Sequence, residues 1–263
     1  MAARRSPWAW ASAGLLVGAL AGGLVYAPAR WLAGALVWAD APVQLLNPSG
    51  TVWQGDAQLV LRSQAQEQTA LPGRVRWNIR PAWQDRSPGL RMAWQADCCL
   101  DAPWIWHATG GLQSVELRLS DLPAGRGLRL PAALLVGLGT PWNTLQLDGQ
   151  LVLETRSLQL LASAGSARLE GEVVLDALRL STSLSTLKPL GSYRVALRGG
   201  TSTRLTLTTQ EGALQLSGTG ELSPGRLVFD GEARAAEGRE EALSNLLNII
   251  GQRQGARSLI HLG

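Results

Sequence analysis

Beyond residue 50, apolar residues occupy every second position in many segments, and this pattern restricts the fold more than any other feature of the chain. The alternating segments are 145–153, 166–175, 193–197, 203–208, 213–217 and 226–230. Successive side chains of a strand point to opposite faces, so such alternation indicates half-buried antiparallel strands. Glycine-rich breaks at 198–201 and 210–212 suit hairpin turns. We therefore expect a mainly β fold with few short helices.

A short motif with a central glycine recurs in these segments: an apolar residue, any residue, Gly, any residue, then Val, Leu or Ala. It occurs at 53–57, 147–151, 169–173 and 229–233, with a degenerate copy at 216–220. A glycine inside a strand weakens pairing but permits a bulge or a bend. The spacing is too irregular for a solenoid repeat. We interpret the motif as a device that curves the antiparallel sheet; unrelated turns are the simpler alternative.

Few segments have helical periodicity. Residues 131–138 predict a short helix that ends before Gly139. Near the C-terminus an apolar stripe at i, i+3, i+4 and i+7 predicts a second helix, formed by Leu243, Leu246, Leu247 and Ile250. Glu240 and Glu241 favour its N-terminus and Gly251 its end. A last strand over 258–262 is expected to return to the sheet.

The N-terminal segment is uncharged from residue 6 to residue 29 and directly follows Arg4 and Arg5. About 20 apolar residues in a helix span roughly 30 Å, the thickness of a bilayer's hydrocarbon core. We therefore expect a single transmembrane helix over 8–27, with a longer helix reaching residue 38 as a variant. The charge bias places residues 1–7 in the cytoplasm and a β-rich domain over 40–263 in the periplasm. A signal peptide cleaved at 27–29 is the alternative.

Three glycines within this segment, Gly14, Gly18 and Gly22, repeat every four residues. This spacing lines up small residues on one helix face, where a second helix can approach closely. The face predicts a membrane partner or a homodimer through the helix. The abundance of Gly and Ala in the chain is the simpler explanation.

The net charge of +4 does not indicate a nucleic-acid surface. Three of the 24 basic residues, Arg4, Arg5 and Arg30, precede residue 31, so the rest of the chain carries 21 basic against 20 acidic residues. Such a near-neutral body lacks the electrostatic footprint of nucleic-acid binding. No nucleic-acid partner is expected.

Groups suited to catalysis or to metal binding are scarce. His107 and His261 are the only histidines, and the sequence contains no nucleophile elbow, phosphate-binding loop or zinc-protease motif. Cys98 and Cys99 are adjacent; they could form a vicinal disulfide, pair between chains or stay free. Adjacent strand residues point to opposite faces, which makes them poor joint metal ligands. We expect no enzymatic activity, no catalytic residues, no cofactor and no metal.

Four segments, taken together, resemble one known family. They are Gly50–Gly55, Leu71–Trp77, Leu187–Tyr193 and Leu246–Gly251. Their order and spacing are similar to those of the type II secretion system protein N family, also called general secretion pathway protein N. The resemblance runs from the apolar segment to the C-terminus.

This resemblance implies a non-enzymatic inner-membrane component of the machine that exports folded proteins from the periplasm across the outer membrane. Other inner-membrane components of that system are the implied partners. The family is also similar in fold to periplasmic lipid carriers of the AsmA type. The alternative function is therefore an inner-membrane-anchored module that binds or transfers lipid.

Overall fold

The computed structural model describes residues 7–62, 68–84, 87–111, 114–140, 142–163, 166–223 and 226–263. The strands in these ranges join into one antiparallel sheet, so the expectation of a mainly β fold is confirmed. The first half contributes β1 (Val43–Gly50), β2 (Gln54–Arg62), β3 (Gln68–Ala70), β4 (Val75–Gln84), β5 (Ser87–Ala96), β6 (Trp104–Gly110), β7 (Ser114–Leu119) and β8 (Leu128–Pro131). The second half contributes β9 (Asp148–Ser163), β10 (Ser166–Ser181), β11 (Gly191–Arg198), β12 (Thr203–Gly212), β13 (Leu214–Ser223), β14 (Arg226–Ala235), β15 (Gln252–Gln254) and β16 (Arg257–Leu262).

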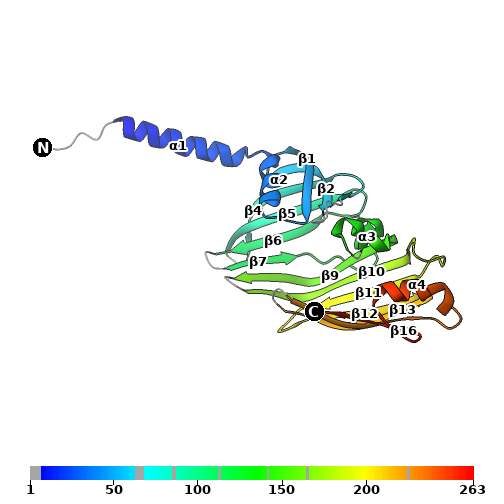
Figure 1. Cartoon of the computed structure of the whole chain (residues 1–263). Helices are drawn as coiled ribbons and strands as arrows, with labels where there is room; N and C mark the ends of the chain where they lie inside the picture. Colours follow the sequence, from blue (N-terminus) through cyan, green and yellow to red (C-terminus); the bar gives the residue numbers. More distant parts are fainter. Residues whose placement is uncertain are drawn as a thin grey trace.

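The order of the strands across the sheet follows the sequence almost throughout. It runs β1-β2-β4-β5-β6-β7-β9-β10-β11-β12-β13-β14-β16-β15, while β3 pairs with β2 and β8 with β9. Figure 1 shows this order as a stack with β1 at the top and β16 at the bottom. Hairpins connect many of the neighbouring strands, which agrees with the glycine-rich breaks between the alternating segments. The β7–β9 connection instead contains β8, η1 and α3, and the β14–β16 connection contains α4 and β15.

The helices are few and short, and most of them lie beside the sheet. They are α1 (Pro7–Val25), α2 (Ala29–Trp38), the 3₁₀ helix η1 (Ala132–Leu138), α3 (Trp142–Leu145) and α4 (Glu240–Ile250). The predicted helices at 131–138 and near the C-terminus correspond to η1 and α4, and the predicted last strand to β16. The expected strand at 145–153 begins later than its alternation suggested, because Leu145 ends α3 and β9 starts at Asp148.

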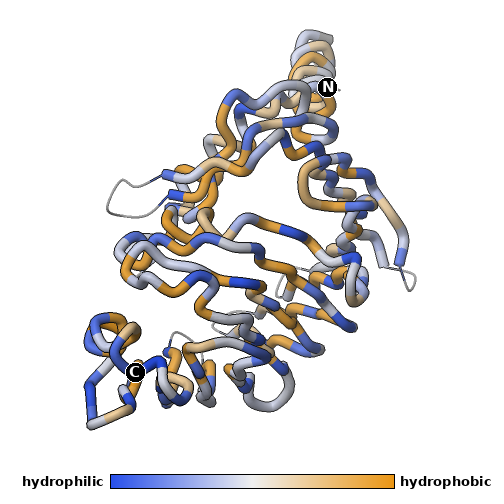
Figure 2. The backbone as a smooth tube through the Cα atoms, turned by 90° about the vertical axis from the view of Figure 1, so that its right-hand side faces the viewer, coloured by the Kyte–Doolittle hydropathy of each residue, from blue (hydrophilic) through white to orange (hydrophobic). Residues whose placement is uncertain are grey.

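The largest core lies between the second half of the sheet and α4. Leu243, Leu246 and Leu247 of α4 are at most 1% exposed. They belong to one apolar cluster with residues from η1 and strands β9 to β14, among them Ala132, Leu151, Ala177, Tyr193, Leu214 and Ala233. The apolar stripe of α4 thus covers the apolar face that period-two alternation creates. Figure 2 shows that alternation as hydrophobic and hydrophilic stretches along the strands.

Two uses of glycine are visible in the motif that the sequence repeats. Gly171 has a φ of +92° and lies where the β9–β10 register shifts, between Glu170 and Glu172. Gly218 and Gly231 instead face each other across β13 and β14, and the Phe229 ring lies over both. A side chain at either position would collide with that ring. The glycine of the motif therefore permits a bulge at one place and leaves space for an aromatic ring at another.

The expectation of a membrane-spanning helix over 8–27 is not supported. Helix α1 covers 19 residues. Within the described ranges, no helix combines the length and the apolarity needed to cross a bilayer. The helix also does not continue unbroken to residue 38, because Pro28 separates it from α2.

Residues at the end of α1 and in α2 connect them to the first strands of the sheet. The Trp53 indole N–H donates to the Leu24 carbonyl at 2.7 Å, and the Val52 N–H donates to the Ala27 carbonyl at 2.8 Å. Buried Ala29 of α2 lies in a small cluster with Ala57 and Trp77. The rest of α1 extends away from the sheet in Figure 1.

Candidate functional site

The two histidines lie far apart in the structure. His107 on β6 faces Arg91 of β5 and Arg118 of β7 across the sheet. The exposed His261 on β16 pairs with Asp230, with 2.6 Å between Nδ1 and Oδ1. Among the residues that the structure describes, no group of three or more His, Cys, Asp or Glu side chains is arranged to hold a metal ion.

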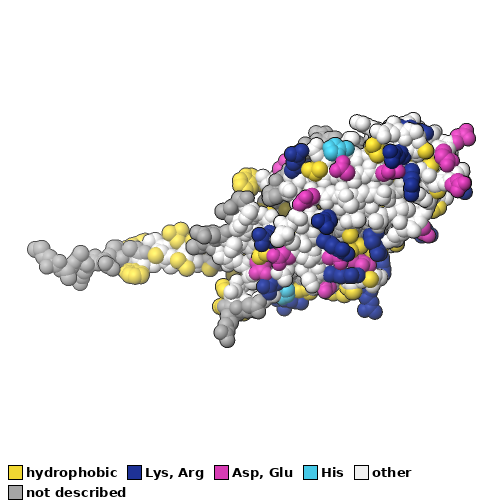
Figure 3. All heavy atoms as spheres, turned by 90° about the horizontal axis from the view of Figure 1, so that it is seen from below, with side chains coloured by type: hydrophobic (Ala, Val, Ile, Leu, Met, Phe, Trp, Pro, Cys, Tyr) yellow, Lys and Arg dark blue, Asp and Glu magenta, His cyan; other side chains and the backbone are white. Residues whose placement is uncertain are grey.

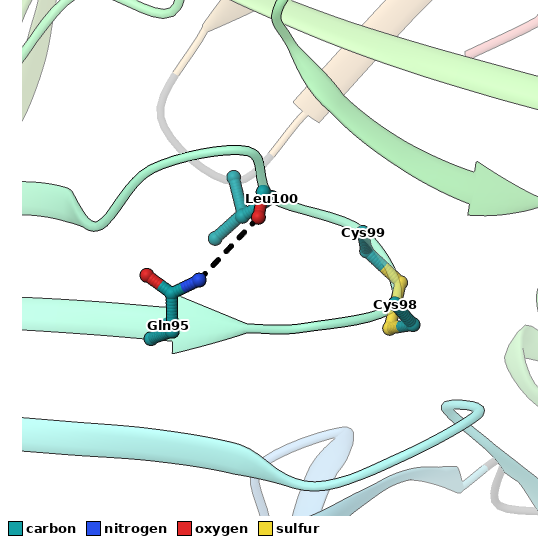
Figure 4. Close-up of a disulfide and its surroundings, with 4 residues drawn as sticks. All are labelled: Gln95, Cys98, Cys99 and Leu100. Atoms are coloured by element: carbon teal, nitrogen blue, oxygen red, sulfur yellow. Dashed lines mark hydrogen bonds between the residues drawn. A yellow bond between two sulfur atoms is a disulfide. The ribbon is translucent and has the colours of Figure 1, made fainter.

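Cys98 and Cys99 form a vicinal disulfide in the turn between β5 and β6, as Figure 4 shows. The N–H groups of Cys99 and Leu100 both donate to the Ala96 carbonyl, at 2.9 and 2.8 Å. The Cys99 carbonyl accepts from the N–H of Arg129, at 2.9 Å, next to the start of β8. These bonds tie the turn to the sheet on both sides.

A cleft of about 770 Å³ opens beside this disulfide. Its walls include both cysteines, Arg129 of β8, Arg179 of β10 and Lys188 of the β10–β11 connection. Arg129 pairs with Asp101 at 3.4 Å and donates to the Gly125 carbonyl at 2.7 Å. Lys188 and Arg179 are exposed, and no ion pair to them is found within the described residues. No sequence pattern predicted this cleft, although Lys188 is the only lysine in the chain.

Four tryptophans gather on the first half of the sheet. The ring centroids of Trp94 and Trp106 are 5.2 Å apart, and those of Trp104 and Trp106 are 5.1 Å apart. Trp77 is 2% exposed and its indole donates to the Val52 carbonyl at 3.1 Å. The indole N–H groups of Trp94 and Trp106 are buried without an acceptor in the described structure. Trp83, by contrast, is 79% exposed. Four of the rings are therefore packing groups on the apolar side of the sheet.

A charged cluster connects strand β2 with the segment that leads into strand β4. The carboxylate of Asp56 accepts hydrogen bonds from the Ser49 hydroxyl and from Nε of Arg74. A guanidinium nitrogen of Arg74 also donates to the Asn47 carbonyl at 2.9 Å. The hydrogen bond from Ser49, then that from Arg74, holds the pKa of Asp56 below its usual value.

This lowered pKa makes part of the stability depend on pH. A depressed carboxyl pKa adds stability that is present above the unfolded pKa of about 4 and disappears as the pH falls through the lower folded value. In urea unfolding from pH 7 to about pH 2.5, the difference between wild type and Asp56→Asn is expected to be constant near neutrality and to shrink below about pH 4. The exposed Glu237→Gln variant is the control. A difference that persists unchanged at the acid end would contradict the prediction.

Gly14, Gly18 and Gly22 lie on α1 with nothing within 4 Å of the position where a Cβ would stand. The large side chains of the same helix are exposed as well: Leu15, Leu16, Leu20 and Leu24 have 61 to 73% of their surface free. Figure 3 shows α1 as an apolar projection from a body on which acidic and basic side chains are mixed. This helix therefore leaves a continuous set of large apolar side chains uncovered in the described chain.

Comparison with known proteins assigns most of the chain to one family. A family model described as "Type II secretion system (T2SS), protein N" matches residues 41–259, which include nearly all of the sheet. No curated protein and no solved structure matches the chain. The match confirms the resemblance carried by the four sequence segments and covers most of the chain. The chain therefore belongs to the type II secretion system protein N family.

Proposed function

We propose that this protein is a non-enzymatic component of the type II secretion system that assists the assembly or operation of the apparatus from the inner membrane. The observation that carries the proposal is the family match over residues 41–259. The architecture supports it, because one broad sheet with exposed edges and faces offers area for contacts with other proteins. The comparisons give no support to the lipid-carrier alternative.

Two features support a place at the membrane with the sheet in the periplasm. The exposed leucines of α1 need an apolar environment, which a membrane or a membrane protein supplies. The disulfide between Cys98 and Cys99 belongs to an oxidising compartment, and the periplasm is one. The N-terminal residues would then lie on the cytoplasmic side, as the basic pair Arg4 and Arg5 favours.

Deletion of the gene tests the proposed role. Enzymes exported by the type II system are expected to accumulate in the periplasm, and a plasmid copy of the gene should restore their release. The measurement compares enzyme activity in the medium and in the periplasm while export is heavily loaded. An unrelated periplasmic enzyme that is not exported serves as the control for leakage. Export at the wild-type rate under load would contradict the proposal.

We also propose that the Gly14, Gly18 and Gly22 face of α1 is where another secretion component approaches. The open space at the three glycines supports this contact, because small residues let two helices pack closely. In the same assay, a Gly14→Leu and Gly18→Leu copy should fail to restore export. As the control, Ala13→Leu adds apolar bulk to the opposite helix face and should restore it. Equal restoration by both copies would exclude the contact.

A further inference from the structure

The strand register brings four basic residues from four strands into one row. Arg80 of β4 lies opposite Arg91 of β5, Arg91 opposite His107 of β6, and His107 opposite Arg118 of β7. Residues directly opposite each other in a sheet point to the same face. The face is the one opposite to the tryptophan cluster, because Arg80 and Arg91 differ by an odd number of positions from Trp77 and Trp94 on the same strands.

Little negative charge among the described residues balances this row, called here the Arg80–Arg118 row. Arg118 forms an ion pair with Glu116 on its own strand. Arg80 and Arg91 are both exposed, and neither has an ion pair or a side-chain hydrogen bond with the parts of the chain that the structure describes. Like charges directly opposite each other destabilise a sheet. The row is therefore an arrangement that an external anion would stabilise.

The residues beside the row limit the shape of that anion. On one side, Asn78, Ala93 and Ile105 lie in register on the same face; on the other side, Ala82, Gly89 and Thr109 do. These neighbours are uncharged and mostly small; on β7 the carboxylate of Glu116, in register with Thr109, is the one that pairs with Arg118. The positive charge is therefore a narrow line and not a broad patch. A flat anionic membrane surface would be met better by a broad patch, so the line favours a partner whose own charges are arranged in a line.

The spacing of the row matches one face of a helix. Adjacent strands are about 4.8 Å apart, so the four positions span about 14 Å. Residues three and four apart on a helix have Cβ atoms about 5–6 Å apart, and about 14 Å corresponds to two and a half helical turns. Carboxylates at i, i+3, i+7 and i+10 would each come near one member of the row. In an extended peptide, residues on one face are about 6.8 Å apart, which fits less well.

We propose that the Arg80–Arg118 row binds an acidic helix of a partner protein, with the helix axis crossing strands β4 to β7. Arg80 and Arg91 make the strongest contacts because no carboxylate of the described chain competes for them. The proposal rests on the register and the charges alone, so it holds or fails independently of the secretion role. Its measurable signs are a requirement for glutamates on one helix face and a strong dependence on salt.

The test uses the full chain and a fluorescent alanine-based helical peptide with four glutamates on one face. An isomeric peptide carries the same glutamates distributed around the helix. Fluorescence anisotropy at about 20 mM and about 150 mM salt is expected to show tighter binding of the one-face peptide, and weaker binding at the higher salt. Arg80→Gln with Arg91→Gln should weaken binding at low salt by about tenfold.

A matched control removes two positive charges elsewhere. Arg179→Gln with Lys188→Gln neutralises the two exposed cations of the cleft beside the disulfide and should leave peptide binding unchanged. Circular dichroism shows whether both variants are folded; the Arg80 and Arg91 variant should unfold at no lower temperature than wild type, since it removes two facing like charges.

Four results would overturn the proposal. They are equal binding of the two peptides, an undiminished affinity of the Arg80 and Arg91 variant, an equal loss in the control variant, and no binding of the one-face peptide at low salt. Vesicles containing phosphatidylglycerol provide a further arm. Vesicle binding that is stronger than peptide binding and is lost in the Arg80 and Arg91 variant would assign the row to a membrane surface instead.

Discussion

Replacement of Leu246 and Leu247 together by alanine is expected to remove most of the protein's stability. Both side chains are 1% exposed and fill the space between α4 and the sheet. A buried Leu→Ala substitution costs about 2–5 kcal/mol, through lost transfer free energy and the cavity left behind. Two such losses approach the whole stability of a typical domain, about 5–15 kcal/mol. Urea unfolding followed by tryptophan fluorescence measures the change.

Ile249→Ala is the matched control for this prediction. Ile249 belongs to the same helix but is 46% exposed. Its truncation is expected to lower the free energy of unfolding by no more than about 1 kcal/mol. If the double leucine variant lost less than about 2 kcal/mol, the assignment of α4 as the cover of the main core would be wrong. The comparison separates burial from helix propensity, because every change replaces a long aliphatic residue of one helix by alanine.

Replacement of Gly171 by alanine is expected to produce the second largest loss. Its φ of +92° is unfavourable for any residue with a Cβ. A Cβ there would also stand 2.3 Å from the Ser157 carbonyl oxygen on β9, and backbone atoms cannot move aside as a flexible side chain can. Ser157 is itself held in place, because its N–H donates to the Asp121 carboxylate at 2.6 Å. The expected loss in the free energy of unfolding is at least about 3 kcal/mol.

Gly125→Ala separates the two causes. Gly125 has a similar φ of +78°, but nothing lies within 4 Å of its Cβ position. That variant should therefore lose only the cost of the left-handed conformation, about 1–2 kcal/mol. Denaturant midpoints of the two variants and the wild type give the comparison. Equal losses at Gly171 and Gly125 would show that the close approach of β9 and β10 at the bulge is not rigid.

Local pattern was enough to predict the β class, most strands of the second half of the sheet and two of the helices, but it specified none of strands β1 to β8. Period-two alternation indicated the antiparallel strands, and the spacing of Leu243, Leu246 and Leu247 indicated the helix that covers them. The membrane-spanning part of the prediction for residues 8–27 is not supported, since no helix within the described ranges combines the length and the apolarity needed to cross a bilayer. The predicted start of a strand at Leu145 was too early, because alternation does not show where a short helix ends and a strand begins.

The candidate surfaces were much harder to predict. The sequence left three outcomes open for Cys98 and Cys99: a vicinal disulfide, pairing between chains, or free thiols. In the structure they form a disulfide in the turn between β5 and β6. The cleft beside them also depends on Arg179 and Lys188, which lie about 80 to 90 residues further along the chain. No local pattern connects positions at such separations. Only the pairing of strands brings them together.

The sequence by itself determined the β class, the covering helix near the C-terminus and the family, because each of these depends on residues close together in the chain or on the order of short segments. The tertiary structure alone decided which charges are neighbours. Arg80, Arg91, His107 and Arg118 become one row through register, and a shift of one residue in any pairing would send a side chain to the other face. Register is set by the packing of the buried face, which is a property of the whole sheet.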